Sequence, residues 1–111
     1  MTTFDDRDKG FENKFAHEKE SSFKITARRN KLLGLWAAGK QGMSGADAEQ
    51  YARDIVLAEF EAGGDSSQDV VDRLLADFGR AKVALSERDI RAEMNRLEPI
   101  ARKQILGDDA F

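Results

Sequence analysis

The stretch that decides the fold is "RRNKLLGLWAAGKQGMSG", residues 28 to 45. Within it, Gly34 to Gln41 falls one residue short of the phosphate-binding pattern G-x-x-x-x-G-K-[ST]. A phosphate loop needs a buried strand before its first glycine, and here a charged, helix-type segment precedes Gly34. Gln41 also lacks the hydroxyl that would bind magnesium. We therefore expect Gly34 to lie inside a helix that ends near Gly39 and Gly42.

This first helix is predicted to run from about residue 21 to residue 38. Its larger apolar side chains recur at helical spacing, and such spacing is typical of one buried stripe. The expected stripe comprises Phe23, Ala27, Leu32, Leu35 and Trp36.

Serine residues predict the starts of three further helices. Ser44 and Ser86 each have an Asp three residues later, an arrangement similar to a capping box. Ser66 or Ser67 is placed to cap the helix between these two. Apolar residues recur every three or four positions after each start. The last two stripes are Val70, Val71, Leu74, Leu75 and Phe78, and Ile90, Met94, Leu97, Ala101 and Ile105.

Glycine and proline mark the helix ends. Gly63, followed by Gly64, and Gly107 come after the last periodic residues, where a left-handed cap costs least. Pro99 lies within the last stripe, so we expect a kink or a break there. The pattern predicts an all-α fold, a four-helix bundle made by residues 21–111.

Composition limits the function. The chain has 111 residues, 41% of them hydrophobic and 35% charged, which is typical of one soluble globular domain. It has no Cys, so it has neither disulfides nor thiolate metal sites, and no metal centre is expected. The net charge of −3 argues against nucleic acid as a partner. No apolar run approaches the roughly 20 residues of a membrane span, so we expect no membrane insertion and a cytoplasmic location.

Residues 1–20 differ from the rest and are predicted to form a mobile, partly helical N-terminal arm. No Leu, Ile or Val precedes Ile25, yet Phe4, Phe11 and Phe15 fall within roughly 40° of one another on a helix. Gly10 weakens such a helix by about 1 kcal/mol relative to Ala. One interpretation is a first helix that starts early and packs these rings on the bundle. We favour an arm that becomes helical in a partner's groove.

A basic run follows the arm. Between Ser21 and Lys31 there are four basic residues and no acidic one: Lys24, Arg28, Arg29 and Lys31. The plain interpretation is a solvated helix face. The alternative is a site for a phosphate or an acidic partner, with Trp36 as a stacking surface.

An enzymatic function is not expected, and we assign no catalytic residue. The single histidine, His17, lies in the predicted arm, where a positioned proton transfer is hard to arrange. Several carboxylates lie four residues before a cation, as in the Glu87 and Arg91 pair and the Glu98 and Arg102 pair. Such pairs mark solvated helix faces.

The runs "FDDRDKGFENKFAHEKE" and "ARRNKLLGLWAAGKQG" resemble the zeta subunit family of α-proteobacteria, which regulates the rotary F-type ATP synthase. The resemblance covers essentially the whole chain. It implies a four-helix bundle, monomeric when free, whose N-terminal segment inserts into the catalytic head formed by the α, β and γ subunits and blocks ATP hydrolysis. Bound to the synthase, the protein would sit at the cytoplasmic face of the inner membrane.

The resemblance also implies where the sites lie. The inhibitory arm would use Phe4, Phe11 and Phe15, together with the basic residues Arg7, Lys9 and Lys14. Family members bind ADP or ATP in the bundle as a regulatory ligand, and no cofactor is required. From charge we place that site at Arg28, Arg29 and Lys31, near Trp36. The main alternative is a generic helical adaptor without a nucleotide, and an RNA-binding bundle is disfavoured by the acidic remainder.

Overall fold

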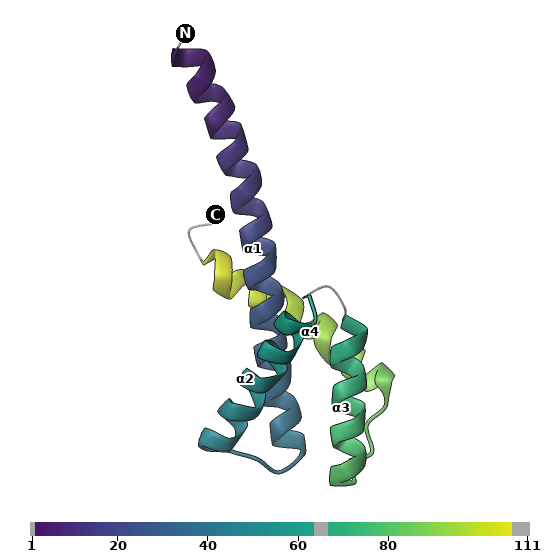
Figure 1. The fold of residues 1–111 in the computed structure, drawn as a ribbon. Coiled ribbons are helices and arrows are strands. Elements are labelled where there is room, and N and C mark those ends of the chain that lie inside the picture. The colour runs from purple at the N-terminus through teal and green to yellow at the C-terminus, as the bar shows by residue number, and fades with distance from the viewer. Residues whose placement is uncertain (1, 64–66, 108–111) are drawn as a thin grey trace.

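The computed structural model describes the backbone of residues 2–63 and 67–107, and the side chains of those residues from Ser21 onward. It contains four helices: α1 Thr2–Lys40, α2 Gly45–Glu61, α3 Ser67–Ala81 and α4 Glu87–Leu106. The described residues include no strand. Helices α2 and α4 pack against α1, and α3 packs against α4 and α2 (Figure 1). The predicted all-α, four-helix fold is confirmed.

Helix α1 is the central element, and its first half extends beyond the other three helices (Figure 1). It begins at Thr2, earlier than the start near residue 21 that the apolar pattern indicates. The side chains before Ser21 lie outside the described residues, so the packing of Phe4, Phe11 and Phe15 is not seen. The division into an arm and a bundle at residue 20 therefore stays a prediction.

Gly34 lies inside α1, where this helix crosses α2. A Cβ atom built on Gly34 would meet the Cα atom of Ala52 at 2.8 Å and its Cβ atom at 3.2 Å. Ala52 is itself fully buried. The glycine is therefore required by the close approach of two helix backbones, and the prediction that it belongs to a helix is confirmed.

The end of α1 has the hydrogen bonds of a Schellman motif. The amide of Met43 donates to the carbonyl of Ala38 at 2.9 Å, and the amide of Gly42 donates to the carbonyl of Gly39 at 3.1 Å. Gly42 has a φ of 88°, a left-handed conformation that favours glycine. The predicted termination near Gly39 and Gly42 is confirmed.

The expected buried stripe of α1 is largely wrong. Phe23 is 49% exposed, and Leu35 and Trp36 are only half-buried. The buried face of the helix instead contains Ile25 and Leu33. The reason is that α1 packs against helices on more than one side, so its buried surface is broader than one stripe and shifted from it.

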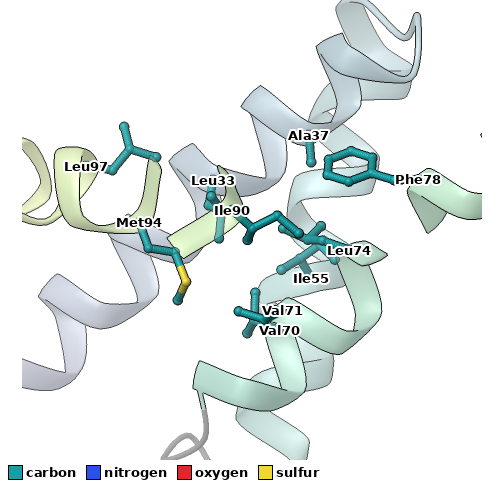
Figure 2. Close-up of a cluster of buried hydrophobic side chains, with 10 residues drawn as sticks. All are labelled: Leu33, Ala37, Ile55, Val70, Val71, Leu74, Phe78, Ile90, Met94 and Leu97. Carbon is teal, nitrogen blue, oxygen red and sulfur yellow. The ribbon is translucent and has the colours of Figure 1, made fainter. Parts of the chain in front are cut away.

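The core lies where the four helices meet. Leu33 and Ala37 of α1 share this buried cluster with side chains from every other helix (Figure 2). The stripes predicted for α3 and α4 supply most of the remaining members, and Ile55 supplies the contribution of α2. The cluster comprises Leu33, Ala37, Ile55, Val70, Val71, Leu74, Phe78, Ile90, Met94 and Leu97.

Two of the three predicted serine caps, Ser44 and Ser86, differ in their hydrogen bonds. Ser86 forms a complete capping box, because its hydroxyl accepts from the amide of Asp89 and the carboxylate of Asp89 accepts from the amide of Ser86. Ser44 occupies the N-cap of α2 but makes no side-chain capping hydrogen bond. The capping box expected at Ser44 is therefore absent. Ser66 lies outside the described residues, and α3 begins at Ser67.

Pro99 does not break α4, which continues from Glu87 to Leu106. Of the two expected outcomes, a kink or a break, the break is therefore wrong. Both Pro99 and Asn95, whose carbonyl loses its helical partner, are exposed, so water can satisfy that carbonyl. Gly107 caps the C-terminus of α4 as predicted, and its amide donates to the carbonyl of Lys103 at 2.7 Å.

Candidate functional site

A groove with four cationic side chains lies between α1 and α2 and reaches the last turn of α4. Lys24, Arg28 and Lys31 of α1 line one part of it, and Arg53 of α2 lines another. The volume of the groove is about 410 Å³, within the range of small-molecule sites. Its apolar lining consists of Phe23, Ala27, Val56, Leu57 and Ile105. We call this site the basic groove.

Helical geometry explains why these cations gather. Lys24, Arg28 and Lys31 are spaced by four and three residues, so they share one face of α1. Arg28 is held toward α4 by a hydrogen bond of 3.4 Å from its Nη1 to Oε1 of Gln104. Arg53 donates to the side-chain oxygen of Gln50 at 3.5 Å. Both arginines thus donate to neutral amide oxygens, and these two hydrogen bonds do not neutralise the charge of either guanidinium.

The structure places Arg29 outside the basic groove. Its Nη1 atom forms an ion pair of 3.3 Å with Oε2 of Glu98, which ties α1 to α4. Its Nε and Nη2 atoms also donate to Oδ1 of Asn30, at 3.3 and 3.1 Å. Arg29 therefore links α1 to α4, and it lies on a different face of α1 from Arg28 and Lys31.

Trp36 also lies apart from the basic groove. Its ring meets the ring of Phe78 edge to face, with centroids 5.9 Å apart and an interplanar angle of 80°. The Nζ atom of Lys40 lies 6.0 Å from the indole centroid, within cation–π range. Of the four residues predicted for nucleotide binding, the structure brings Arg28 and Lys31 together in one groove and places Arg29 and Trp36 elsewhere.

Sequence reasoning missed several of the groove's residues. Lys24 belongs to the basic run for which an anion site is the alternative interpretation, but it is not among the residues predicted to bind a nucleotide. Arg53 and the apolar lining of α2 and α4 are distant in sequence, and only the folding of three helices brings them to α1. No local spacing signals such a meeting, although the exposed Leu57 at 56% is an apolar residue on a polar helix face.

A second, apolar hollow adjoins the basic groove and shares part of its lining. Phe23 of α1 and Phe60 of α2 meet edge to face across it, with centroids 5.7 Å apart and an angle of 76°. Both rings are about half exposed, and Leu57 lies beside them. Two buried polar residues, Asn30 and Glu59, line its inner side. This hollow of about 260 Å³ leaves part of both aromatic rings exposed to water.

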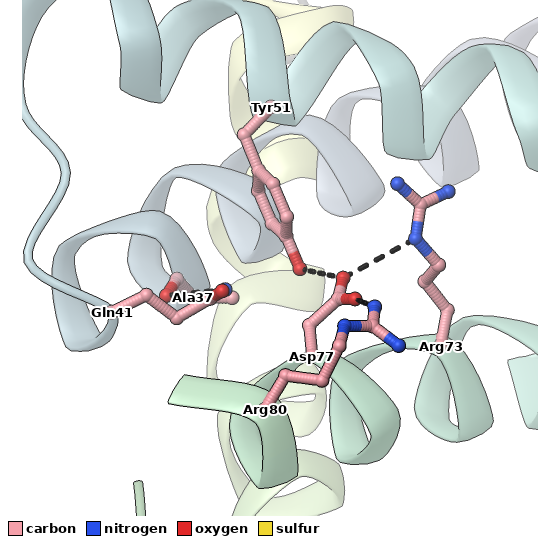
Figure 3. Close-up of polar contacts among 6 residues, drawn as sticks. All are labelled: Ala37, Gln41, Tyr51, Arg73, Asp77 and Arg80. Atoms are coloured by element: carbon pink, nitrogen blue, oxygen red, sulfur yellow. Dashed lines mark hydrogen bonds and ion pairs between the residues drawn. The ribbon is translucent and has the colours of Figure 1, made fainter. Parts of the chain in front are cut away.

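A polar cluster joins α2 to α3 around the buried Asp77 (Figure 3). Tyr51 donates its hydroxyl to Oδ2 of Asp77 at 2.5 Å, and Nε of Arg73 donates to the same oxygen at 3.2 Å. Arg80 pairs with the other oxygen. Burial, reinforced by the hydrogen bond to Asp77, raises the pKa of Tyr51 well above its ordinary value. Tyr51 therefore stays a neutral donor, and the cluster is a structural tie between helices.

Among residues 21–63 and 67–107, no three His, Cys, Asp or Glu side chains group closely enough to hold a metal ion. His17 and the six residues assigned to the arm, namely Phe4, Arg7, Lys9, Phe11, Lys14 and Phe15, lie outside the described side chains. Within the same ranges, no helix combines the length and the hydrophobicity that a membrane span requires.

The fold and the groove define a small all-helical protein with one basic, ligand-sized site between its first two helices. The model of one family, ATPase inhibitor subunit zeta, matches residues 1–104. The chain therefore belongs to the ATPase inhibitor subunit zeta family, and the resemblance seen in the sequence is confirmed. A comparison with curated proteins found no match. Membership identifies a regulatory, inhibitory subunit of an ATPase.

Proposed function

We propose that this protein inhibits ATP hydrolysis by the rotary F-type ATP synthase, and that it does so by inserting residues 1–20 into the catalytic head. The observation that carries the proposal is membership in a family of ATPase inhibitor subunits. The length of α1 supports the mechanism, because its first half extends beyond the other helices and is available to a partner (Figure 1). The three aromatic rings of this segment would anchor it in a cleft between the catalytic subunits.

The mechanism follows from the need of a rotary catalyst to open and close its clefts in turn. A helix bound in an open cleft must be expelled before that cleft can close, so binding stabilises the open state. The inhibition is therefore mechanical and requires no catalytic group from this chain. Arg7, Lys9 and Lys14 would add ion pairs with acidic side chains at the rim of the cleft.

The experiment is an assay of ATP hydrolysis by the purified catalytic head with three forms of the protein. The full chain should inhibit, and a chain lacking residues 1–19 should not. A triple variant with Phe4, Phe11 and Phe15 replaced by Ala should lose most of the inhibition. Phe60→Ala is the matched control, because Phe60 is an exposed Phe outside both the arm and the lining of the basic groove, and it should inhibit like the native chain. Full inhibition by the truncated chain would refute insertion and favour a generic adaptor that docks through another surface.

We further propose that the basic groove binds ADP or ATP as a regulatory ligand. Its four cations suit a polyphosphate, and the apolar surface of Phe23, Val56 and Leu57 suits the base. The nucleotide would bias the arm between free and bound states only if its affinity differs between those states. The groove and the arm are carried by the same helix, which offers a direct route for such coupling.

Titration with ADP, followed by amide chemical shifts, tests the site. The expected shifts centre on residues 24–31 and 53–57, with little change at Trp36. Arg53→Gln should weaken ADP binding about tenfold, the loss of one charged hydrogen bond. Arg102→Gln is the control, because Arg102 pairs with Glu98 away from the groove. Equal affinities in the two variants, or shifts only near Trp36, would remove the assignment.

A further inference from the structure

The basic groove is lined by cations and by apolar side chains. Lys24, Arg28, Lys31 and Arg53 supply its positive charge, and the other side chains of its lining are aliphatic or aromatic. Among the lining residues that the structure describes, none carries a carboxylate, a hydroxyl or an amide oxygen in its side chain. The groove therefore offers an anion several donors, and its described lining offers a divalent cation no side-chain ligand.

Two amide oxygens beside the groove are engaged by its arginines. Oε1 of Gln104 accepts from Arg28 at 3.4 Å, and Oε1 of Gln50 accepts from Arg53 at 3.5 Å. A magnesium ion that used either oxygen would lie beside a guanidinium, and the two positive charges would repel each other. These oxygens are therefore poor substitutes for the missing ligands.

The lining of the groove suits a nucleotide without its metal ion. Proteins that bind a nucleotide together with Mg²⁺ supply oxygen ligands to the metal, such as carboxylates or a Ser or Thr hydroxyl. Mg²⁺ also cancels most of the negative charge of ADP and occupies phosphate oxygens that a guanidinium would otherwise bind. In this groove the Mg²⁺ complex would thus lose ion pairs and gain no side-chain ligand from the described lining.

We propose that the basic groove binds metal-free ADP and ATP and discriminates against their Mg²⁺ complexes, an inference that rests on the proposed nucleotide function of the groove. ATP binds Mg²⁺ more tightly than ADP does, because its extra phosphate adds negative charge. At a given concentration of Mg²⁺, a larger fraction of ADP than of ATP is therefore metal-free. The groove responds mainly to ADP when Mg²⁺ is present, although ATP has the larger charge.

Titrations of ADP and of ATP in EDTA and at increasing Mg²⁺, at constant ionic strength, test the selectivity. In EDTA both nucleotides should bind, ATP more tightly. When free Mg²⁺ is about tenfold above the Mg²⁺ dissociation constant of a nucleotide, the apparent Kd for that nucleotide should rise about tenfold, since most of it is in the complex. ATP should lose affinity at a lower Mg²⁺ concentration than ADP. An apparent Kd that is unchanged by Mg²⁺, or lowered by it, overturns the proposal.

Mg²⁺ without any nucleotide is the first control. It should not move the amide signals of residues 24–31 and 53–57. Shifts of those signals would mean that the groove binds the metal itself, which would also overturn the proposal.

Inorganic tripolyphosphate, which has no base, separates this inference from the nucleotide proposal. It should bind in EDTA and lose affinity with Mg²⁺ as the nucleotides do. Arg53→Gln should weaken its binding in EDTA about tenfold, whereas Arg102→Gln, which changes a cation away from the groove, should not. Equal affinities of the two variants would place the anion elsewhere and overturn the proposal. Mg²⁺-sensitive binding of tripolyphosphate, without binding of either nucleotide, would remove the nucleotide assignment alone. Binding of none of these anions would remove both.

Discussion

The hydroxyl of Tyr51 lies 2.5 Å from Oδ2 of Asp77, and this hydrogen bond joins α2 to α3. Ile55 of α2 also shares the buried apolar cluster with side chains of α3. Asp77 is buried and receives two arginines from its own helix as well, Arg73 and Arg80. The attachment of α3 to α2 therefore includes a buried charged group, which is stable there because it is paired and hydrogen-bonded.

Replacing Tyr51 with Phe should destabilise the fold. The variant keeps the ring and removes one donor from a buried carboxylate, and hydrogen bonds to charged groups contribute at least about 1.5 kcal/mol. We expect the free energy of unfolding to fall by about 1.5 kcal/mol, measured by urea denaturation with circular dichroism. The control Arg102→Gln removes an exposed ion pair and should cost less than about 0.5 kcal/mol. Equal stabilities of Tyr51→Phe and the native chain would show that the contact contributes nothing.

The same contact predicts a dependence of stability on alkaline pH. Burial raises the pKa of Tyr51 above its ordinary value near 10, so the folded state favours the neutral phenol. This stabilisation is fully present below pH 10 and is lost as the pH rises through the folded pKa. We expect the native chain to lose stability above pH 10 more steeply than Tyr51→Phe. Ultraviolet titration of the single tyrosine gives the pKa directly, and ionisation near pH 10 in the folded protein would contradict the prediction.

The helix crossing at Gly34 predicts opposite effects for two glycine substitutions. Gly34→Ala places a methyl group 2.8 Å from the Cα atom of Ala52, and the helix backbones must separate. We expect a net loss of about 1–3 kcal/mol. Gly79→Ala in α3 meets no atom within 4 Å, so it should gain up to about 1 kcal/mol from helix propensity. Thermal denaturation of both variants shows whether their changes in stability have opposite signs. A more stable Gly34→Ala would show that α1 and α2 are not closely packed at this crossing.

The two serine caps form a matched pair. Ser86→Ala removes a hydroxyl that accepts from the amide of Asp89 and should cost about 1 kcal/mol. Ser44→Ala removes a hydroxyl that makes no capping hydrogen bond and should cost much less. Denaturation in urea at neutral pH measures both. A larger loss in Ser44→Ala would mean that the α2 cap forms in solution.

The left-handed backbone conformation of Lys82 predicts that a substitution at this position is stabilising. It ends α3 with a φ of 60°, and the amides of Lys82 and Val83 make the bonds of a Schellman motif to Gly79 and Phe78. A left-handed residue with a Cβ atom costs about 1 kcal/mol or more, so Lys82→Gly should raise stability by about 1 kcal/mol. Lys82→Ala keeps the Cβ atom and should give no such gain. Equal gains in the two variants would assign the effect to charge instead of backbone conformation.

Apolar spacing and the capping residues in the sequence were sufficient to predict the four helices and most of their ends. The spacing of Val70 to Phe78 and of Ile90 to Ala101 identified the buried faces of α3 and α4, because each of these amphipathic helices presents one apolar face to the core. The same reasoning failed for α1, which is packed from several sides. A hydrophobic stripe cannot describe a helix whose buried surface includes Asn30 and Gly34.

The candidate site was only half visible in the sequence. Arg28 and Lys31 share a helix face by spacing alone, so their meeting in the groove was predictable. Arg53 and Ile105 reach the groove through tertiary packing, and Arg29 leaves it because Glu98 of α4 offers an ion pair. Buried acids such as Asp77 carry no sequence signal, because their burial depends on partners far along the chain.

The single Trp of the chain stands against Phe78, between the first and third helices and away from the basic groove. Its fluorescence should therefore follow detachment of the third helix during unfolding, while staying silent when the groove is filled. Tryptophan fluorescence can therefore measure unfolding without any added label. Titrations of a ligand into the basic groove will need a different spectroscopic signal.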